Sequence, residues 1–167
     1  MKIIIETERL FLREMTEVDA ENAYLLNSEF DVIKYTGDEA FSSVEEARTF
    51  LRSYPDYKLH GYGRWAVIRK EDSRFLGWCG IKYSPHINEH DIGFRFMKAY
   101  WNKGYASEAA LACLNYGIKS LNLKTIVGNV RVENKASIQV LKKIGLSYVG
   151  EFIEQNTLHY KFKIDNF

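Results

Sequence analysis

The clearest hydrophobic pattern in the chain lies over residues 104–121. Apolar and small residues recur there at the spacing of one helical face, and they are Ala106, Ala109, Ala110, Cys113, Leu114, Gly117 and Leu121. Because the first of these side chains are small, the predicted helix can pack close to a sheet. Predicted strands lie before it, at His90–Met97, and after it, at Thr125–Val132. A helix that joins two strands in this way makes a right-handed parallel crossover.

Alternating or branched apolar patterns predict five further strands, and capping signals predict three further helices. The strands are Thr7–Glu14, Arg64–Arg69, Phe75–Tyr83, Leu146–Glu154 and Leu158–Ile164. The helices run from Thr16 to about Asn27, from Ser43 to about Tyr54, and from Asn134 to Ile144, and residues 30–41 form a loop or a short helical turn. Short turns make residues 64–97 an antiparallel meander. This order predicts one α/β (α+β) domain over residues 1–167, with a mixed, mostly antiparallel sheet of about seven strands and about four helices.

Composition excludes several classes of protein but does not indicate which reaction, if any, the protein catalyses. Hydrophobic residues make up 46% and charged residues 27% of the chain, and the formal net charge is +1. This balance argues against a nucleic-acid partner. No apolar run approaches the ~20 residues of a membrane span, and Met1–Glu6 is apolar too briefly for a signal peptide. Cys79 and Cys113 lack the spacing of metal ligands, so we expect free thiols, no metal and a cytoplasmic location.

The segment Trp101–Glu108 is the first candidate for chemistry, because it joins a predicted strand to the start of a helix through Gly104. Backbone N–H groups at a helix start have no partner inside the helix, and the helix dipole adds positive potential there. Such a turn can hold a phosphate group. A plain strand–helix connection that binds nothing is the alternative. A dinucleotide-binding oxidoreductase is disfavoured, because the spacing Gly-x-Gly-x-x-Gly is absent.

Several segments resemble, in the same order, the motifs of the GNAT acetyltransferases. They are Thr7-Glu8-Arg9-Leu10 with Leu12-Arg13, Trp65-Ala66-Val67, Leu76-Gly77 with Gly80, Ile92-Gly93-Phe94, Trp101 to Ala109, and Asn134 to Ile138 with Leu141, Lys143 and Gly145. The resemblance runs from Thr7 to about Tyr160 and is closest to the RimJ/RimL branch, which acetylates N-terminal amines of ribosomal proteins. The specificity of the resemblance lies in the order of these motifs along the chain.

The resemblance implies that acetyl-CoA binds as a co-substrate in a wedge where the fourth and fifth predicted strands splay apart. Its pyrophosphate is then expected on the backbone amides of Asn102, Lys103, Gly104, Tyr105, Ala106 and Ser107. The pantetheine arm is expected along Arg95, Phe96 and Met97, bonded as if it were an added strand. Asn134 is expected to contact this arm, and a plain helix N-cap is the alternative for it.

Acetyl transfer to an amine requires a proton acceptor, donors for the developing oxyanion and a stabiliser for the leaving thiolate. Asp91 occupies the place of the family's strand-four glutamate and is expected to be the base, through a water because Asp is the shorter side chain. It is expected to be unpaired because Arg95 lies ~13 Å along the strand. A solvated carboxylate at the end of the strand is the alternative for it. Backbone N–H groups near Phe96 and Met97 are candidates for the oxyanion. Many members place a tyrosine acid where this chain has Leu141. Ser137 is then the candidate for a hydrogen bond to the CoA sulfur, as a positioning group because a hydroxyl is a poor acid, and an ordinary helix serine is the alternative for it.

The acceptor site is expected to be lined by aromatic residues, with Tyr35, Trp65, Trp78 and Tyr160 as candidates and a role in the core as the alternative for each. The expected function is transfer of the acetyl group to a primary amine, foremost a protein or peptide N-terminus, in a ternary complex. A small amine such as an aminoglycoside or a polyamine is the alternative acceptor. A CoA-binding module without transferase activity is the alternative function. A monomer and a homodimer both remain open.

Overall fold

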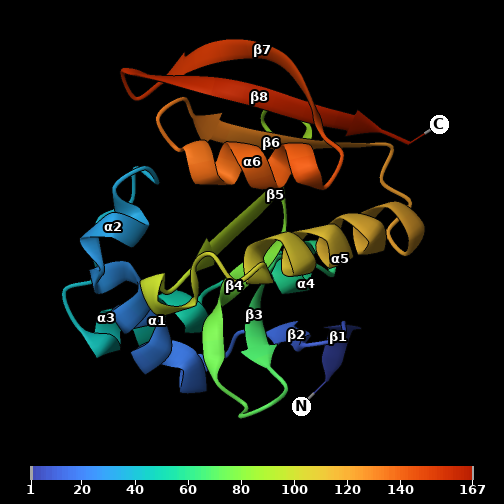
Figure 1. Cartoon of the computed structure of the whole chain (residues 1–167). Coiled ribbons are helices and arrows are strands. Elements are labelled where there is room, and N and C mark those ends of the chain that lie inside the picture. The colour runs from blue at the N-terminus through green and yellow to red at the C-terminus, as the bar shows by residue number, and fades with distance from the viewer. Residues whose placement is uncertain (1, 167) are drawn as a thin grey trace.

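The computed structural model describes residues 2–166 and contains one eight-stranded sheet with the order β1-β2-β3-β4-β5-β6-β8-β7 (Figure 1). The strands are β1 (Ile3–Glu6), β2 (Leu10–Glu14), β3 (Arg64–Arg69), β4 (Phe75–Ser84), β5 (Glu89–Phe96), β6 (Thr125–Arg131), β7 (Ser147–Glu154) and β8 (Thr157–Asp165). The helices are α1 (Ala20–Ser28), α2 (Phe30–Ile33), α3 (Val44–Arg52), α4 (Asp56–His60), α5 (Tyr105–Lys119) and α6 (Lys135–Lys143), with 3-10 turns η1 (Glu17–Asp19) and η2 (Lys98–Tyr100).

The pairing of the strands agrees with the mixed sheet that the sequence predicts. Strands β3, β4 and β5 form an antiparallel meander, and β5 and β6 are parallel neighbours joined through α5. All other neighbouring pairs are antiparallel. Among the described residues, no helix is long and apolar enough to cross a membrane.

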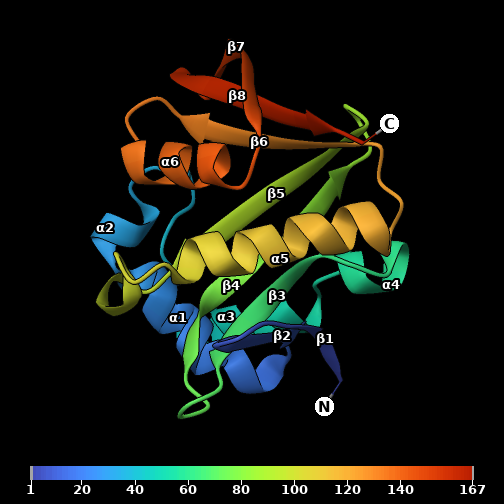
Figure 2. The same cartoon turned by 45° about the vertical axis from the view of Figure 1, so that its right-hand side comes forward.

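The sheet is covered by helices on both faces, and each face has its own hydrophobic core. Figure 2 shows α5 lying across one face, with α6 beside β6. The core under α5 and α6 includes Trp65, Cys79 and Cys113, and both cysteines are buried free thiols as predicted. The other core lies under α1 and α3 and includes Ala66 and Ile68. Strand β3 is therefore buried on both faces, which explains its nearly continuous apolar sequence.

One strand and one α-helix were not predicted from the sequence. The first is β1, an edge strand whose Ile3, Ile5 and Glu6 pair with β2. Its three successive isoleucines carry no alternation, so only pairing with β2 identifies it as a strand. The second is α4, which follows directly after the point near Tyr54 where the sequence predicts the preceding helix to end. Pro55 is the N-cap of α4, and proline is tolerated at a helix start because no N–H donor is needed there. The strand expected from Thr7 begins at Leu10 instead.

Candidate active site

The sheet opens into a fork between β5 and β6. The two strands pair only at Asp91 and Val127 and then diverge, as Figure 2 shows. Beyond this point β5 continues to Phe96, bonded on its other side to β4. One edge of β5 therefore has no strand neighbour over its last residues, and an extended ligand can add to it as a strand does. Arg95 and Phe96 lie on this stretch, and Met97 follows it.

Two backbone groups at the end of this stretch are already used within the protein. The N–H of Met97 donates to the carbonyl of Leu76 at 2.9 Å. The expectation that Met97 offers its N–H to an oxyanion is therefore wrong, because a backbone N–H that pairs with a neighbouring strand is not free for a ligand. The carbonyl of Phe96 likewise accepts from the indole Nε1 of Trp101 at 2.8 Å.

At the wide end of the fork, the turn before α5 has the backbone of an anion site. Asn102 and Gly104 both have left-handed conformations, with φ of 59° and 80°. Such a turn gathers successive N–H groups into a concave surface. The N–H of Glu108 makes the first backbone bond of the helix, to the carbonyl of Gly104 at 3.0 Å. The amides of Tyr105, Ala106 and Ser107 precede it and have no acceptor within the helix. These donors suit a pyrophosphate.

Helix α6 starts on the other side of the fork. The side-chain oxygen of Asn134 accepts from the N–H of Ser137 at 3.2 Å, so Asn134 is an N-cap. Ser137 is half-buried in the first turn. Leu141, in the place of the family's tyrosine, is only 2% exposed. A methyl group on Gly128 would lie 2.7 Å from a Leu141 methyl carbon. Leu141 thus fills the core against β6.

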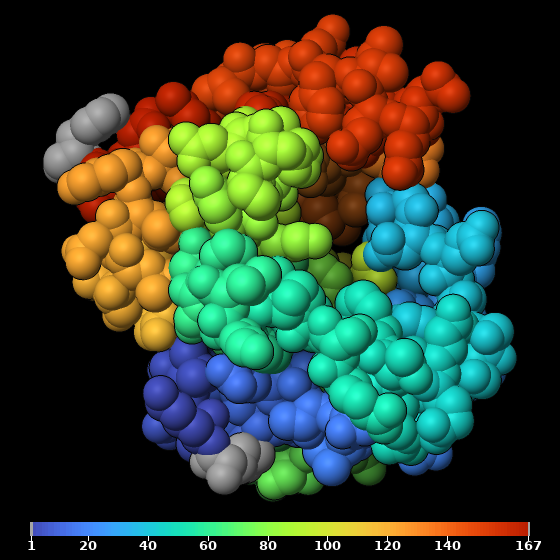
Figure 3. Space-filling view, turned by 180° about the vertical axis from the view of Figure 1, so that it is seen from behind, coloured from blue at the N-terminus to red at the C-terminus, as the bar shows by residue number. Residues whose placement is uncertain are grey.

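A cavity of about 460 Å³ lies on the opposite face of the sheet, toward α1 and α3. Figure 3 shows this side, with a hollow between α2, α3 and the β4–β5 turn. Its lining comprises Met15, Ala23, Leu26, Asn27, Asp38, Glu39, Phe41, Phe50, Leu51, Tyr54, Arg64, Trp78, Lys82 and Arg95. The guanidinium groups of Arg64 and Arg95 lie 5.2 and 5.1 Å from the ring centre of Trp78. Arg95 also pairs with Asp38 at 2.6 Å.

The structure tests the four aromatic residues expected around the acceptor. Trp78 lines the cavity. The expectation for Trp65 is wrong, because it is 1% exposed and packs edge-to-face on Tyr116 of α5 in the opposite core. Tyr35 and Tyr160 are half-buried and are not among the residues that line the cavity. Tyr160 packs against the core under α5 and α6 instead.

Asp91 is paired, contrary to the expectation from the sequence. Nη2 of Arg64 lies 2.6 Å from its carboxylate, and Nη1 of Arg64 donates to the Asp91 carbonyl at 2.9 Å. The Asp91 side chain is 25% exposed. Its burial raises the pKa of the carboxyl above the usual range, although the Arg64 charge and hydrogen bond oppose the shift. A carboxyl with a raised pKa is a stronger base than an ordinary aspartate.

No pattern in the sequence connects Arg64 with Asp91, which lie 27 residues apart. The one feature of the sequence that bears on this contact is the glycine at position 93, because it leaves space beside β5. A methyl group there would lie 2.7 Å from Cζ of Arg64. The glycine of the Ile92-Gly93-Phe94 segment therefore leaves the space through which the guanidinium reaches β5.

Comparison with known proteins identifies the family. A family described as "Acetyltransferase (GNAT) domain" matches residues 9–147. The uncharacterized N-acetyltransferase YnaD of Bacillus subtilis is 36% identical over 150 residues, which cover 89% of this chain and 85% of that protein. A GNAT-family acetyltransferase structure from Bacillus anthracis superposes with a TM-score of 0.83 at 32% identity and covers 96% of this chain and 97% of that one.

Two more distant structures have the same fold and different acceptors in their names. A spermidine N-acetyltransferase from Vibrio cholerae, in complex with CoA and spermine, has a TM-score of 0.80 at 18% identity and covers 95% of this chain and 96% of that one. A ribosomal-protein-S5-alanine acetyltransferase from Vibrio fischeri has a TM-score of 0.75 at 19% identity and covers 96% and 95%. At these identities the likeness concerns the fold alone. The family match and the relatives of higher identity show that the chain belongs to the GNAT family and is an acetyl-CoA-dependent N-acetyltransferase.

Proposed function

We propose that the protein transfers the acetyl group of acetyl-CoA directly to the amine of a protein or peptide N-terminus, in a ternary complex. The observation that carries this proposal is the division of the site by β5. The fork and the amide-rich turn lie on one side, and the cavity beside Trp78 and Arg95 lies on the other. A donor in the fork and an acceptor in the cavity approach each other across the end of this strand. No covalent acetyl-enzyme is needed in such an arrangement.

The charges around the cavity favour a peptide amine over a polyamine. Three cationic and two acidic side chains line it, namely Arg64, Lys82, Arg95, Asp38 and Glu39. A polyamine carries several positive charges and needs a surplus of carboxylates. The apolar part of the lining, which includes Phe41, Phe50 and Trp78, suits the side chain of a terminal residue.

In the proposed reaction the amine nitrogen attacks the thioester carbon, the carbon–sulfur bond breaks, and the amine proton passes to Asp91. Arg64 lines the cavity and Asp91 is not among its lining residues, but Asp91 is one-quarter exposed, so the proton is proposed to reach it through a water molecule. Burial raises the pKa of the Asp91 carboxyl, which helps it accept the proton. Ser137 is proposed to donate a hydrogen bond to the sulfur from the first turn of α6.

A thiol-release assay tests this function. Acetyl-CoA is offered with peptides, aminoglycosides and polyamines as acceptors, and turnover is expected foremost with peptides. Asp91→Asn should lower kcat by ~10²–10⁴ while acetyl-CoA still binds. Asp165→Asn is the matched control, because this carboxylate pairs with Lys163 and Thr125 at the far end of β8. Unchanged turnover in Asp91→Asn would remove Asp91 from the mechanism. Acetyl-CoA binding without turnover of any amine would favour a binding module.

A further inference from the structure

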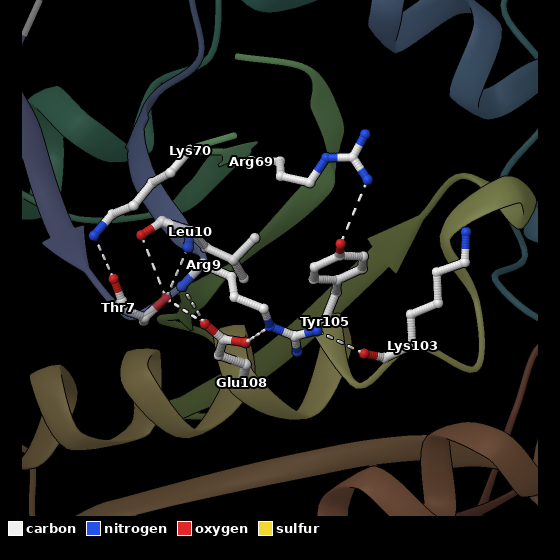
Figure 4. Close-up of polar contacts among 8 residues, drawn as sticks. All are labelled: Thr7, Arg9, Leu10, Arg69, Lys70, Lys103, Tyr105 and Glu108. Atoms are coloured by element: carbon white, nitrogen blue, oxygen red, sulfur yellow. Dashed lines mark hydrogen bonds and ion pairs between the residues drawn. The ribbon is translucent and has the colours of Figure 1, made fainter. Parts of the chain in front are cut away.

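A group of polar contacts fastens the turn before α5 to the start of β2, and Figure 4 shows it. We name it the Glu108 clamp, after the carboxylate at its centre. One oxygen of Glu108 accepts from the Thr7 hydroxyl at 2.6 Å and from the N–H of Arg9 at 3.0 Å. Its other oxygen accepts from Nε of Arg9 at 2.7 Å. These residues lie about a hundred positions apart, and neither the fork nor the cavity uses them.

Arg9 extends the clamp from the helix to the turn itself. While its Nε holds Glu108, its Nη1 donates to the carbonyl of Lys103 at 2.9 Å. In a trans peptide the carbonyl and the next N–H point in opposite directions. By holding the Lys103 carbonyl, Arg9 therefore aims the N–H of Gly104 away from β2. One side chain thus fixes the direction of an amide in the turn that precedes the helix.

The surroundings of Arg9 limit its movement. Its guanidinium lies 4.4 Å from the ring centre of Tyr105, which is itself 8% exposed. A methyl group on Gly104 would lie 3.3 Å from Nη2 of Arg9. The Tyr105 hydroxyl contacts Nη1 of Arg69 at 3.4 Å, so the ring is held from its other end (Figure 4). Glu108 stays charged at neutral pH, because the hydrogen bonds from Thr7 and Arg9 outweigh its burial and lower its pKa.

We propose that Arg9 and Glu108 are positioning residues for the pyrophosphate of acetyl-CoA. They act through the turn, by keeping its amides in the direction that an anion needs before the anion arrives. An ordered set of donors binds more tightly than a set that must first be ordered. The inference rests on the proposed placement of acetyl-CoA in the fork. It also gives the Thr7-Glu8-Arg9-Leu10 segment a role that its distance from the cavity does not suggest.

The test compares two acetyl donors that differ in the pyrophosphate. Acetyl-CoA carries this group, and S-acetyl-pantetheine lacks it. In Arg9→Lys and Glu108→Gln, kcat/KM for acetyl-CoA should fall about tenfold relative to kcat/KM for S-acetyl-pantetheine, and the dissociation constant of CoA should rise by a similar factor. Thr7→Ser keeps the hydroxyl donor and should retain wild-type affinity. Arg52→Lys is the control, because Arg52 forms an exposed pair with Glu17 on the other side of the sheet.

Each outcome decides one question. Equal losses for both donors, or a loss of CoA affinity that follows a fall in melting temperature, would assign the clamp a merely structural role and overturn the proposal. Unchanged CoA affinity in both variants would also overturn the proposed role of the clamp. If the wild-type protein binds CoA in the same experiment, the proposed function is unaffected by that result. If the wild-type protein does not bind CoA, the proposed function fails and the role of the clamp fails with it.

Discussion

The pairing of Arg64 with Asp91 leads to a prediction about stability that does not depend on the acceptor. Replacing Arg64 by Met removes the ion pair at 2.6 Å and two further bonds, to the carbonyls of Gly80 at 2.5 Å and Asp91 at 2.9 Å. The side chains of Arg64 and Asp91 are only 14% and 25% exposed. The Met side chain has no charge to offer, so the Asp91 carboxylate remains mostly buried without an ion-pair partner and keeps only the backbone hydrogen bond from Asn129.

The expected loss follows from this burial. Removing one member of a buried ion pair costs about 3–5 kcal/mol, because the other charge is left without compensation. We expect Arg64→Met to lower the free energy of unfolding by about 3–5 kcal/mol at pH 8. The double variant Arg64→Met/Asp91→Asn should recover part of the loss, because no charge is then buried. Asp91→Asn alone completes the cycle and gives the coupling energy of the pair.

The loss should also depend on pH, with a sign that can be worked out. Burial already raises the pKa of Asp91 in the folded protein. When the pKa of a carboxyl is higher in the folded than in the unfolded protein, its ionisation destabilises the fold. The free energy of unfolding then falls as the pH rises from the unfolded-state pKa, about 3.9, through the folded-state pKa. Without Arg64 the folded pKa rises further, and each unit adds about 1.4 kcal/mol. The difference between wild type and Arg64→Met should therefore be larger at pH 8 than at pH 5.

Urea denaturation followed by circular dichroism at both pH values measures these differences. A loss below about 1 kcal/mol at pH 8 would place the pair among exposed ion pairs, which contribute little. A loss that is equal at pH 5 and pH 8, or that Asp91→Asn does not reduce, would show that Asp91 is not left charged and buried. Either result would refute the reasoning.

Three further predictions concern packing. Gly93→Ala should cost about 1–3 kcal/mol of stability, because its methyl group would displace the Arg64 guanidinium; thermal melting measures this, and a variant as stable as wild type would contradict it. Trp65→Ala should cost about 3–5 kcal/mol in urea unfolding, since Trp65 is 1% exposed, and a loss only in acceptor KM with unchanged stability would contradict its place in the core. Leu141→Tyr should destabilise the fold by about 1–3 kcal/mol, because the larger ring does not fit in the space beside Gly128 that Leu141 fills. It should not raise kcat, and a faster enzyme would show that the phenol reaches the fork.

Local patterns in the sequence were enough to predict most of the fold. The stripe of small and apolar residues identified α5, and short turns between apolar runs identified the β3–β4–β5 meander. Both signals come from residues close together in the chain, where spacing alone determines which side chains share a face. The turn at Gly104 was predicted for the same reason, since glycine before a helix permits the left-handed conformation found there.

Tertiary structure decided which residues meet. Trp65 pairs across the sheet with Cys79, the neighbour of Trp78, so the two tryptophans lie on opposite faces. Only this pairing and the packing of α5 on one face show that Trp65 belongs to the core and Trp78 to the cavity. The contacts of Arg64 with Asp91 and of Arg9 with Glu108 join residues 27 and 99 positions apart. Spacing along the chain carries no information about such pairs. The fold brings these distant groups to within hydrogen-bonding distance. At Arg64 and Asp91, which are only 14% and 25% exposed, burial also makes an unpaired charge costly.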